Sequence, residues 1–131
     1  MFYRYSLTVP PNTLPRDAVR TVMRVGPGIL HSMYIAFPPG CAGLVHIYVS
    51  HWEQQLWPWN TDEQYAWDDY TIPLTQIGFG ITTPPYVFHL CGWSEDDTYP
   101  HTVVCRLGIK RPEPHRPGSW LNRLIRGEYQ E

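Results

Sequence analysis

The sequence predicts an all-β protein: an antiparallel two-sheet sandwich, jelly-roll-like, with about eight strands. Three observations point to this fold class. Apolar and polar residues alternate in many short segments, 14 prolines and 10 glycines separate those segments, and 15% of the residues are aromatic. Alternation with a period of two is typical of strands that bury one face, and proline and glycine are typical of the turns between them. A chain of 131 residues fits one such domain.

The N-terminal half contains four predicted strands. In residues 2–9, alternate residues from Tyr3 to Val9 share one face, which is expected to be buried. Pro10 ends this strand because proline cannot donate a hydrogen bond to the ladder. The following strands are expected over residues 18–25, 29–37 and 44–50. The turn "PPGCAG" separates the last two, and we expect it to be a hairpin or a connection at the sandwich edge.

Four further strands are expected in the second half of the chain. They cover residues 54–57, 70–77, 86–93 and 101–110. Pro73 cannot donate to a ladder, so the second of these strands should lie at a sheet edge or contain a bulge. The acidic turn "SEDDTYP" joins the last two strands. The sandwich domain is therefore expected to comprise residues 1–109.

The remaining residues differ in kind from the strands. Residues 110–119, "KRPEPHRPGS", are rich in proline, which favours an extended arm. Residues 120–131 are expected to form a short amphipathic helix and tail, with Ser119 as N-cap and Gly127 as C-terminal cap. Its apolar face would consist of Trp120, Leu121, Leu124 and Ile125, with Arg123 and Arg126 largely on the other face. A helix this short is marginal in water, so it needs a surface on which to dock.

The charge of the chain argues against binding driven by bulk electrostatics. Ten basic and twelve acidic residues give a net charge of −2, too close to zero for a nucleic-acid-binding protein of that kind. From Lys110 onward, five basic and three acidic residues give +2, so the preceding 109 residues carry −4. We expect no specific nucleic-acid partner, but the tail could meet an acidic surface.

Cysteine content and hydropathy bear on the compartment. Three cysteines, Cys41, Cys91 and Cys105, are too few for a disulfide-stapled secreted scaffold, and we expect small buried thiols made in a reducing cytoplasm. The N-terminus shows no basic region followed by a long apolar segment. No apolar run approaches the roughly 20 residues that a membrane-spanning helix requires.

Catalytic and metal sites find little support in the sequence. The six histidines lack the close Cys and His pairs of structural zinc sites, although a mixed site of His89 with Cys91, or of His101 with Cys105, stays conceivable. The carboxylate groups Asp68-Asp69 and Glu95-Asp96-Asp97 could bind calcium or form a glycosidase pair, but they lie in predicted turns, where aspartate is common. Neither a nucleophile elbow nor a phosphate-binding loop is present. We expect no enzymatic activity, no cofactor and no metal.

The tryptophans are the best candidates for a binding role. The segment "WPWNTDEQYAW", residues 57–67, is polar and loop-like, so one small domain would have difficulty burying all of its rings. Exposed aromatic residues mark protein interfaces or carbohydrate-stacking platforms, and we favour the interface. The predicted partner-binding residues are Trp57, Trp59, Trp67, Trp120, Leu121, Arg123, Leu124, Ile125 and Arg126.

Several phrases carry a resemblance to a known class of proteins. They are "VPPNT", "QLWPWN", "FPPGCAGLVHI" (residues 37–47) and "EDDTYPHTV" (residues 95–103), within a similarity that spans residues 9–109. The sequence resembles small single-domain β-sandwich proteins encoded among the virion genes of bacteriophages. That resemblance implies a structural role in the virion as a capsid decoration, cement or vertex-associated subunit, made in the host cytoplasm. It also implies binding to the major capsid protein or other virion subunits, and it brings no catalytic residues.

Three alternatives belong to other classes. A carbohydrate-binding sandwich, such as a fibre or lectin-like module, would use Trp57, Trp59 and Trp67 as stacking rings. A small metal-dependent enzyme would need histidines and carboxylates that converge in one cleft. A basic helix with tryptophan and leucine could also lie on a membrane surface. With the virion interpretation we also expect self-association into a symmetric homo-oligomer of unknown order.

Overall fold

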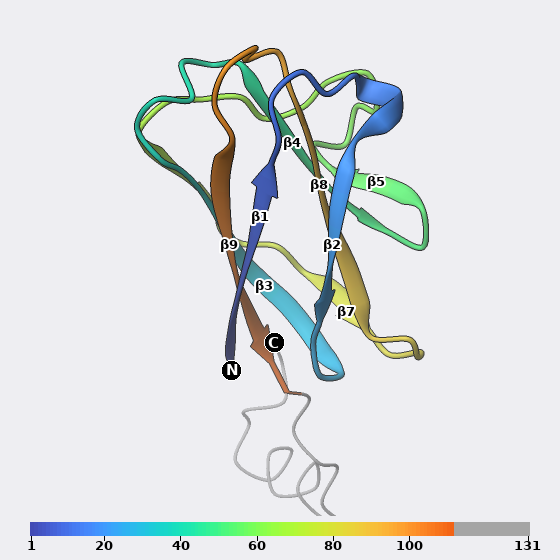
Figure 1. Ribbon diagram of the computed structural model, residues 1–131. Coiled ribbons are helices and arrows are strands. Elements are labelled where there is room, and N and C mark those ends of the chain that lie inside the picture. The colour runs from blue at the N-terminus through green and yellow to red at the C-terminus, as the bar shows by residue number, and fades with distance from the viewer. Residues whose placement is uncertain (112–131) are drawn as a thin grey trace, which may run out of the picture.

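The structure, a computed structural model, describes residues 1–111, which form two antiparallel β-sheets packed face to face (Figure 1). The elements in chain order are β1 (Phe2–Val9), the 3-10 helix η1 (Pro15–Asp17), β2 (Val19–Arg24), β3 (Gly28–Phe37), β4 (Val45–His51), β5 (Gln54–Trp57), β6 (Tyr70–Leu74), β7 (Phe79–Ile81), β8 (Val87–Ser94) and β9 (His101–Lys110). The all-β prediction is confirmed.

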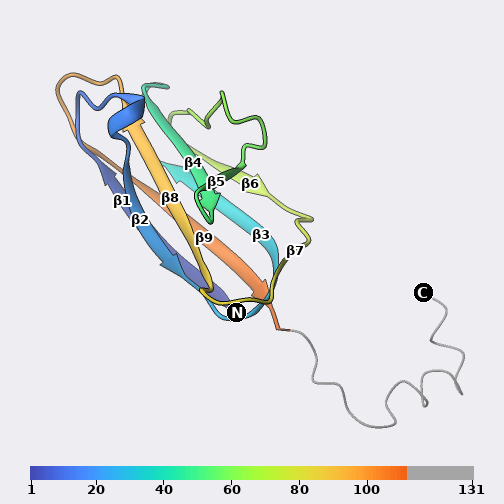
Figure 2. The ribbon, with the colours of Figure 1, turned by 90° about the vertical axis from the view of Figure 1, so that its right-hand side faces the viewer.

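The strand pairing is that of a long hairpin rolled into a sandwich. β1 pairs with β9, β2 with β8, β3 with β6 and β7, and β4 with β5. Successive pairs go to opposite sheets, which gives the orders β1-β9-β3-β6 and β2-β8-β4-β5, with β7 attached to β3. This is a jelly roll, as predicted. Figure 2 shows the two layers edge-on.

The core lies between the sheets because alternate residues of nearly every strand point inward. Leu7 and Val9 of β1, on the face predicted to be inside, are buried. The largest fully buried side chains include Phe88, Met23, Leu30 and Met33. The sheets also approach closely at Gly92, where a Cβ atom would lie 2.7 Å from Ile47 Cδ1 and 3.0 Å from Val9 Cγ2. Gly92 is therefore a packing requirement of the sandwich.

The "PPGCAG" turn connects the two sheets. β3 belongs to the five-stranded sheet and β4 to the four-stranded sheet, so the turn is the sandwich-edge connection and not the hairpin. Cys41 in this turn is fully buried, and Cys91 and Cys105 are buried as well. The prediction of small buried thiols is confirmed.

One predicted strand is shorter than expected and is followed by a strand that the sequence pattern missed. The segment 70–77 was expected to be a single strand, but β6 ends at Leu74 and β7 follows at Phe79–Ile81. Both pair with β3, at different positions along its length, and the Ile77 amide between them donates to the His31 carbonyl at 3.0 Å. β6 is the last strand of its sheet, which agrees with the edge position predicted from Pro73.

β9 ends at Lys110, so the first residue of the arm predicted over residues 110–119 belongs to the last strand. The rest of that arm from Pro112 onward, and the short helix and tail predicted over residues 120–131, lie outside the described residues.

Candidate functional site

Four loops at one end of the sandwich carry most of the acidic residues. They join β1 to β2, β3 to β4, β5 to β6 and β8 to β9, and together we call them the acidic end: residues 10–18, 38–44, 58–69 and 95–100. They contain eight carboxylates and one arginine, which gives a net charge of −7. The nine strands contain no Asp or Glu at all.

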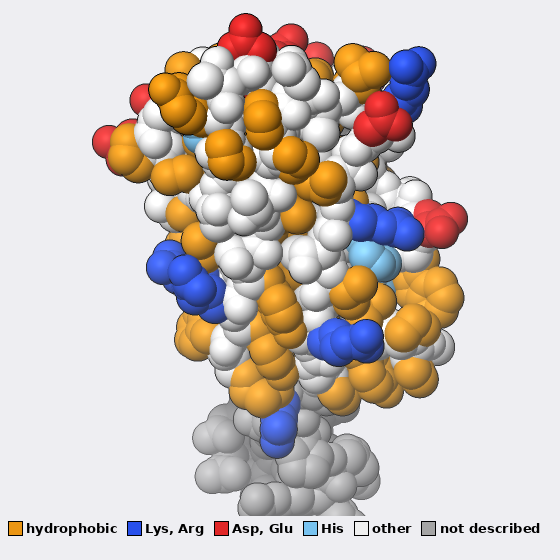
Figure 3. Space-filling view, viewed as in Figure 1, with side chains coloured by type: hydrophobic (Ala, Val, Ile, Leu, Met, Phe, Trp, Pro, Cys, Tyr) orange, Lys and Arg blue, Asp and Glu red, His pale blue; other side chains and the backbone are white. Residues whose placement is uncertain are grey.

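The rest of the described chain has the opposite charge. Residues 1–111 outside the acidic end hold one carboxylate, that of Glu53, and six Lys or Arg side chains, for a net charge of +5. Figure 3 shows acidic side chains gathered toward one end of the molecule, with most of the Lys and Arg side chains below them. Charge is thus separated along the long axis of the sandwich.

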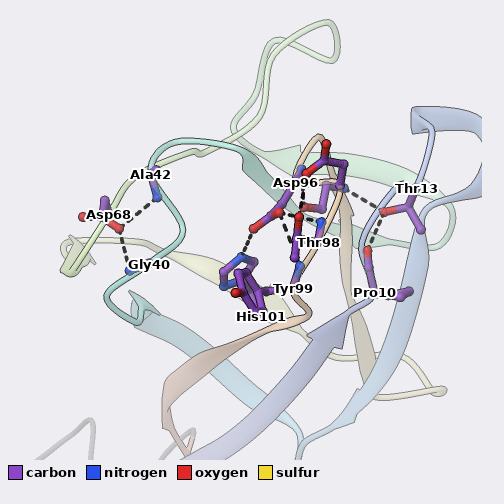
Figure 4. A network of polar contacts seen from close by, with 11 residues as sticks. Pro10, Thr13, Gly40, Ala42, Asp68, Asp96, Thr98, Tyr99 and His101 are labelled. Carbon is purple, nitrogen blue, oxygen red and sulfur yellow. Dashed lines mark hydrogen bonds and ion pairs between the residues drawn. The ribbon is translucent and has the colours of Figure 1, made fainter.

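The Asp96 side chain braces the β8–β9 loop of the acidic end (Figure 4). His101 Nε2 donates to Asp96 Oδ2 at 2.6 Å, and the Thr98 and Tyr99 amides donate to Asp96 Oδ1 at 2.9 and 3.3 Å. The hydrogen bond from His101, followed by that from the Thr98 amide, lowers the pKa of Asp96. Both side chains are largely shielded from solvent. The Asp96–His101 pair therefore holds the β8–β9 loop in place at the start of β9.

Asp68 plays the equivalent part for the β3–β4 loop. Its Oδ1 atom accepts hydrogen bonds from the amides of Gly40 and Ala42, both at 2.9 Å (Figure 4). Because Asp68 belongs to the β5–β6 loop, these bonds tie two loops of the acidic end together. The sequence analysis considered these carboxylates as calcium ligands, as catalytic groups or as ordinary turn residues. Two of them, Asp68 and Asp96, stabilise turns, as the turn interpretation predicts.

Cys41, whose thiol is affected by the charges of both carboxylates, is poorly suited to nucleophilic chemistry. Burial raises the pKa of its thiol to about 11, and the negative charges of Asp68 and Asp96 act in the same direction. A thiol in this setting stays protonated at neutral pH. Burial likewise raises the pKa of Cys105 to about 12 and raises that of Cys91.

The predicted tryptophans divide into two groups. Trp57 lies on β5 and packs against the core, with its ring 5.6 Å from that of Phe79 and 5.8 Å from that of Phe88, centroid to centroid, both in T-shaped geometry. His51 joins the same group at 5.0 Å from Phe88. Trp57, one of the predicted partner-binding residues, is therefore partly buried. Its place in the β5 ladder turns its ring toward the core, where part of its large apolar area is removed from solvent.

Trp59 and Trp67 are exposed. Trp59 is 75% exposed and Trp67 is 53% exposed, both on the β5–β6 loop. The Trp67 ring lies 5.3 Å from that of Tyr70, and Tyr99 on the β8–β9 loop is also exposed. The acidic end thus combines carboxylates with large exposed rings. The alternative of a carbohydrate-stacking platform required Trp57, Trp59 and Trp67. Only Trp59 and Trp67 are available for it, since Trp57 faces the core.

A second site at this end was missed by the sequence. The His46 ring stacks on Trp93 with centroids 3.9 Å apart and planes 9° apart, and His46 Nε2 donates to Glu95 Oε2 at 3.0 Å. Trp93 and Glu95 face the β1–β2 loop across a cavity of about 360 Å³, which Asn12, Thr13, Leu14, Pro15 and Ser94 also line. His46 and Trp93 are partners in the register of β4 and β8, and no local pattern indicates which residues of distant strands pair.

The loop wall of this cavity is tied to the sheet. The Thr13 hydroxyl donates to the Pro10 carbonyl at 3.1 Å and accepts from the Ser94 amide at 2.8 Å (Figure 4). The Thr13 amide donates in turn to the Ser94 carbonyl at 3.1 Å. The cavity therefore has a fixed shape, with one aromatic side chain and one carboxylate positioned by the same histidine.

The mixed metal sites considered from the sequence are not assembled. Cys91 Sγ contacts the His89 carbonyl at 3.8 Å and Ser50 Oγ at 3.7 Å, while His89 Nδ1 is buried without a hydrogen-bond partner among the described residues. Burial, followed by the charge of Arg20, lowers the pKa of His89. Within residues 1–111, no three His, Cys, Asp or Glu side chains are grouped so as to hold a metal ion.

The remaining predicted partner-binding residues, Trp120, Leu121, Arg123, Leu124, Ile125 and Arg126, lie outside the described residues. In the part of the chain that the structure describes, no helix is both long and apolar enough to cross a membrane. Comparisons of the chain with protein-family models, with curated proteins and with solved structures find no match.

Proposed function

We propose that this chain is a structural virion protein, a capsid decoration, cement or vertex-associated subunit that binds neighbouring capsid or accessory subunits. The observation that carries the proposal is the exposure of Trp59 and Trp67 on the β5–β6 loop, which Asp68 ties to the β3–β4 loop. Large exposed rings near charged side chains are typical of protein-binding surfaces, in which Trp and Tyr are enriched. A rigid loop also reduces the entropy lost on binding.

Two further considerations favour a structural role over catalysis. The jelly roll is a fold that viral capsid proteins use, and the sequence resembles small virion proteins of bacteriophages. Three titratable groups of the acidic end have structural roles: Asp96 binds His101, Asp68 binds two amides, and the Cys41 thiol is buried with a raised pKa. A catalytic site needs such groups turned toward a substrate.

The C-terminal segment completes the proposal as a docking arm. In this role the face formed by Trp120, Leu121, Leu124 and Ile125 would be buried on a neighbouring subunit, and Arg123 and Arg126 would influence partner choice through charge. The arm starts where β9 ends, at the opposite end from the loops that carry Trp59 and Trp67. A subunit could therefore contact neighbours at both ends.

The test compares the full chain with a version that ends at Arg111, which retains every strand of the sandwich. Each is mixed with shells assembled from a co-encoded major capsid protein, and binding is measured by co-sedimentation. We expect the full chain to bind the shells and the shorter chain to bind at least about tenfold more weakly, a loss of about 1.4 kcal/mol. If neither form binds shells, the virion proposal fails.

A second candidate function is carbohydrate binding, and the cavity beside Trp93 favours it. Sugar rings pack an apolar face on an aromatic side chain and offer hydroxyls to carboxylates, and Trp93 and Glu95 provide both around a space of about 360 Å³. This function is tested by titrating the protein with a panel of methyl glycosides and monitoring tryptophan fluorescence. Binding that Trp93→Ala abolishes and Trp67→Ala preserves would support this site, and the reverse pattern would support the exposed loop instead.

A further inference from the structure

The outer face of the five-stranded sheet carries two arginines side by side. Arg4 of β1 and Arg106 of β9 are direct partners in the antiparallel register, and Tyr34 of β3 is the next partner along the same row. Both arginine side chains are exposed. Like charges directly opposite each other across a ladder are unfavourable. We call this row of Arg4, Arg106 and Tyr34 the arginine row.

Nothing in the described residues compensates the charge of the arginine row. The strands of the five-stranded sheet contain no Asp or Glu. The ion pairs within residues 1–111 involve Arg16, His46 and His101, and none of them includes Arg4 or Arg106. An exposed pair of arginines with an aromatic neighbour on an otherwise acid-free sheet is suited to an anionic partner that also offers aromatic rings.

The acidic end of the same molecule has that chemistry. It has a net charge of −7 and exposes Trp59, Trp67 and Tyr99. Arginine and tryptophan are the side chains most enriched at the centres of protein interfaces, and guanidinium groups pack favourably on tryptophan faces. The acidic end and the arginine row lie on different parts of one rigid sandwich, so the acidic end of one copy can reach the arginine row only of another copy.

We propose that copies of this chain bind one another head to side, with the acidic end of one copy on the arginine row of the next. Because the two surfaces differ, the contact is heterologous, and repetition closes a ring or extends a filament according to the rotation between copies. The inference rests on the proposed structural role and names another copy of the chain as one of its partners.

The first measurement is the mass of the full chain by light scattering at two ionic strengths. At about 0.01 M salt the screening length is about 30 Å, and at about 1 M it is about 3 Å. We expect association that grows with protein concentration at low salt and a monomer at high salt. A monomer at low salt over the whole range up to about millimolar protein, where a contact worth about 4 kcal/mol would already be half occupied, would overturn the proposal.

Charge reversal identifies the surfaces. Arg4→Glu with Arg106→Glu makes the arginine row acidic. Asp62→Lys with Glu63→Lys removes the net charge of −4 from the β5–β6 loop without touching the bracing residues Asp68 and Asp96. Each double variant should lose association by at least about tenfold at low salt, because the first surface then repels its partner and the second no longer attracts it. A mixture of the two variants in equal amounts should restore association, since each retains the surface that the other needs.

Glu53→Lys is the matched control. It reverses the one carboxylate that lies outside the acidic end in residues 1–111, so it changes the net charge with no change in either surface. We expect it to associate like the natural chain. An equal loss of association in this control would mean that net charge alone drives association. A mixture of the two double variants that stays monomeric would mean that the arginine row binds another partner, such as a polyanion. Either result overturns the proposal.

The outcome is separable from that of the shell-binding test. Association of copies in solution without binding to shells would leave this inference standing and would remove the virion proposal. Binding to shells by a chain that stays monomeric at low salt would do the opposite.

Discussion

Trp57 and Trp59 are two residues apart in the sequence and lie in opposite environments. Trp57 packs with Phe79 and Phe88 on the core, and Trp59 is 75% exposed. The difference comes from their elements: Trp57 is the last residue of β5, whose pairing with β4 sets the direction of its ring, and Trp59 has left the ladder. The same residue type therefore contributes to stability at one position and to the surface at the other.

Substitution of the inner ring should have the largest effect. Trp57→Ala removes an aromatic side chain that packs against Phe79 and Phe88, and we expect a loss of about 3 kcal/mol in the free energy of unfolding. Trp59→Ala is the matched control and should change it by less than about 0.5 kcal/mol. Urea unfolding of both variants measures the difference. Equal effects would mean that the two rings are not divided between core and surface.

The close approach of the sheets at Gly92 should give the next largest effect. Gly92→Ala places a methyl group 2.7 Å from Ile47 Cδ1, 3.0 Å from Val9 Cγ2 and 3.2 Å from the His46 carbonyl oxygen. Overpacking of this kind costs about 1 to 3 kcal/mol. Gly80→Ala serves as control, because no atom lies within 4 Å of the added methyl group. A Gly92→Ala protein as stable as the control would show that the sheets can separate there without cost.

The brace of the acidic end should appear as a dependence of stability on pH. The folded-state pKa of Asp96 is lowered below its ordinary value of 3.8, so the folded protein binds this proton less readily than the unfolded chain. Its contribution is therefore complete above about pH 3.8 and is lost as the pH falls through the lowered folded value. In urea unfolding between about pH 2 and pH 6, Asp96→Asn should reduce the slope of stability against pH in the acid range.

Asp97→Asn is the control for that experiment. It removes the neighbouring carboxyl, whose Oδ1 accepts from the Thr98 hydroxyl and not from His101. We expect the natural slope in this variant. If Asp96→Asn and Asp97→Asn have the same slope, the Asp96–His101 contact does not stabilise the folded state.

The smallest expected effect on stability is at Trp67. Trp67→Ala removes a ring that is 53% exposed and contacts Tyr70, so the free energy of unfolding should change by less than about 1 kcal/mol. The same variant should weaken binding to neighbouring subunits by about tenfold or more if this ring anchors an interface. Co-sedimentation with shells and light scattering at low salt measure the binding. Full binding by Trp67→Ala would remove this ring from the interface.

Alternation along the chain was enough to place most strands, because a strand with one buried face has a local period of two. The expected ranges 2–9, 54–57 and 101–110 match β1, β5 and β9, and proline at position 73 indicated an edge strand. The turn residues also indicated the turn that contains Cys41, but they left open whether it was a hairpin or the connection between sheets that the topology shows. The break between β6 and β7 escaped detection because both strands depend on one distant partner, β3, and not on a local signal.

The sequence by itself determined that the chain would be an all-β sandwich with buried thiols and unevenly distributed charge, since these properties follow from composition and short-range pattern. Only the tertiary structure decided which tryptophan faces the core, that His46 stacks on Trp93, and that Arg4 lies beside Arg106. Each of these depends on the register between strands far apart in the chain. Register follows from how all the inner faces pack together, so it is a property of the whole sandwich and not of any one segment.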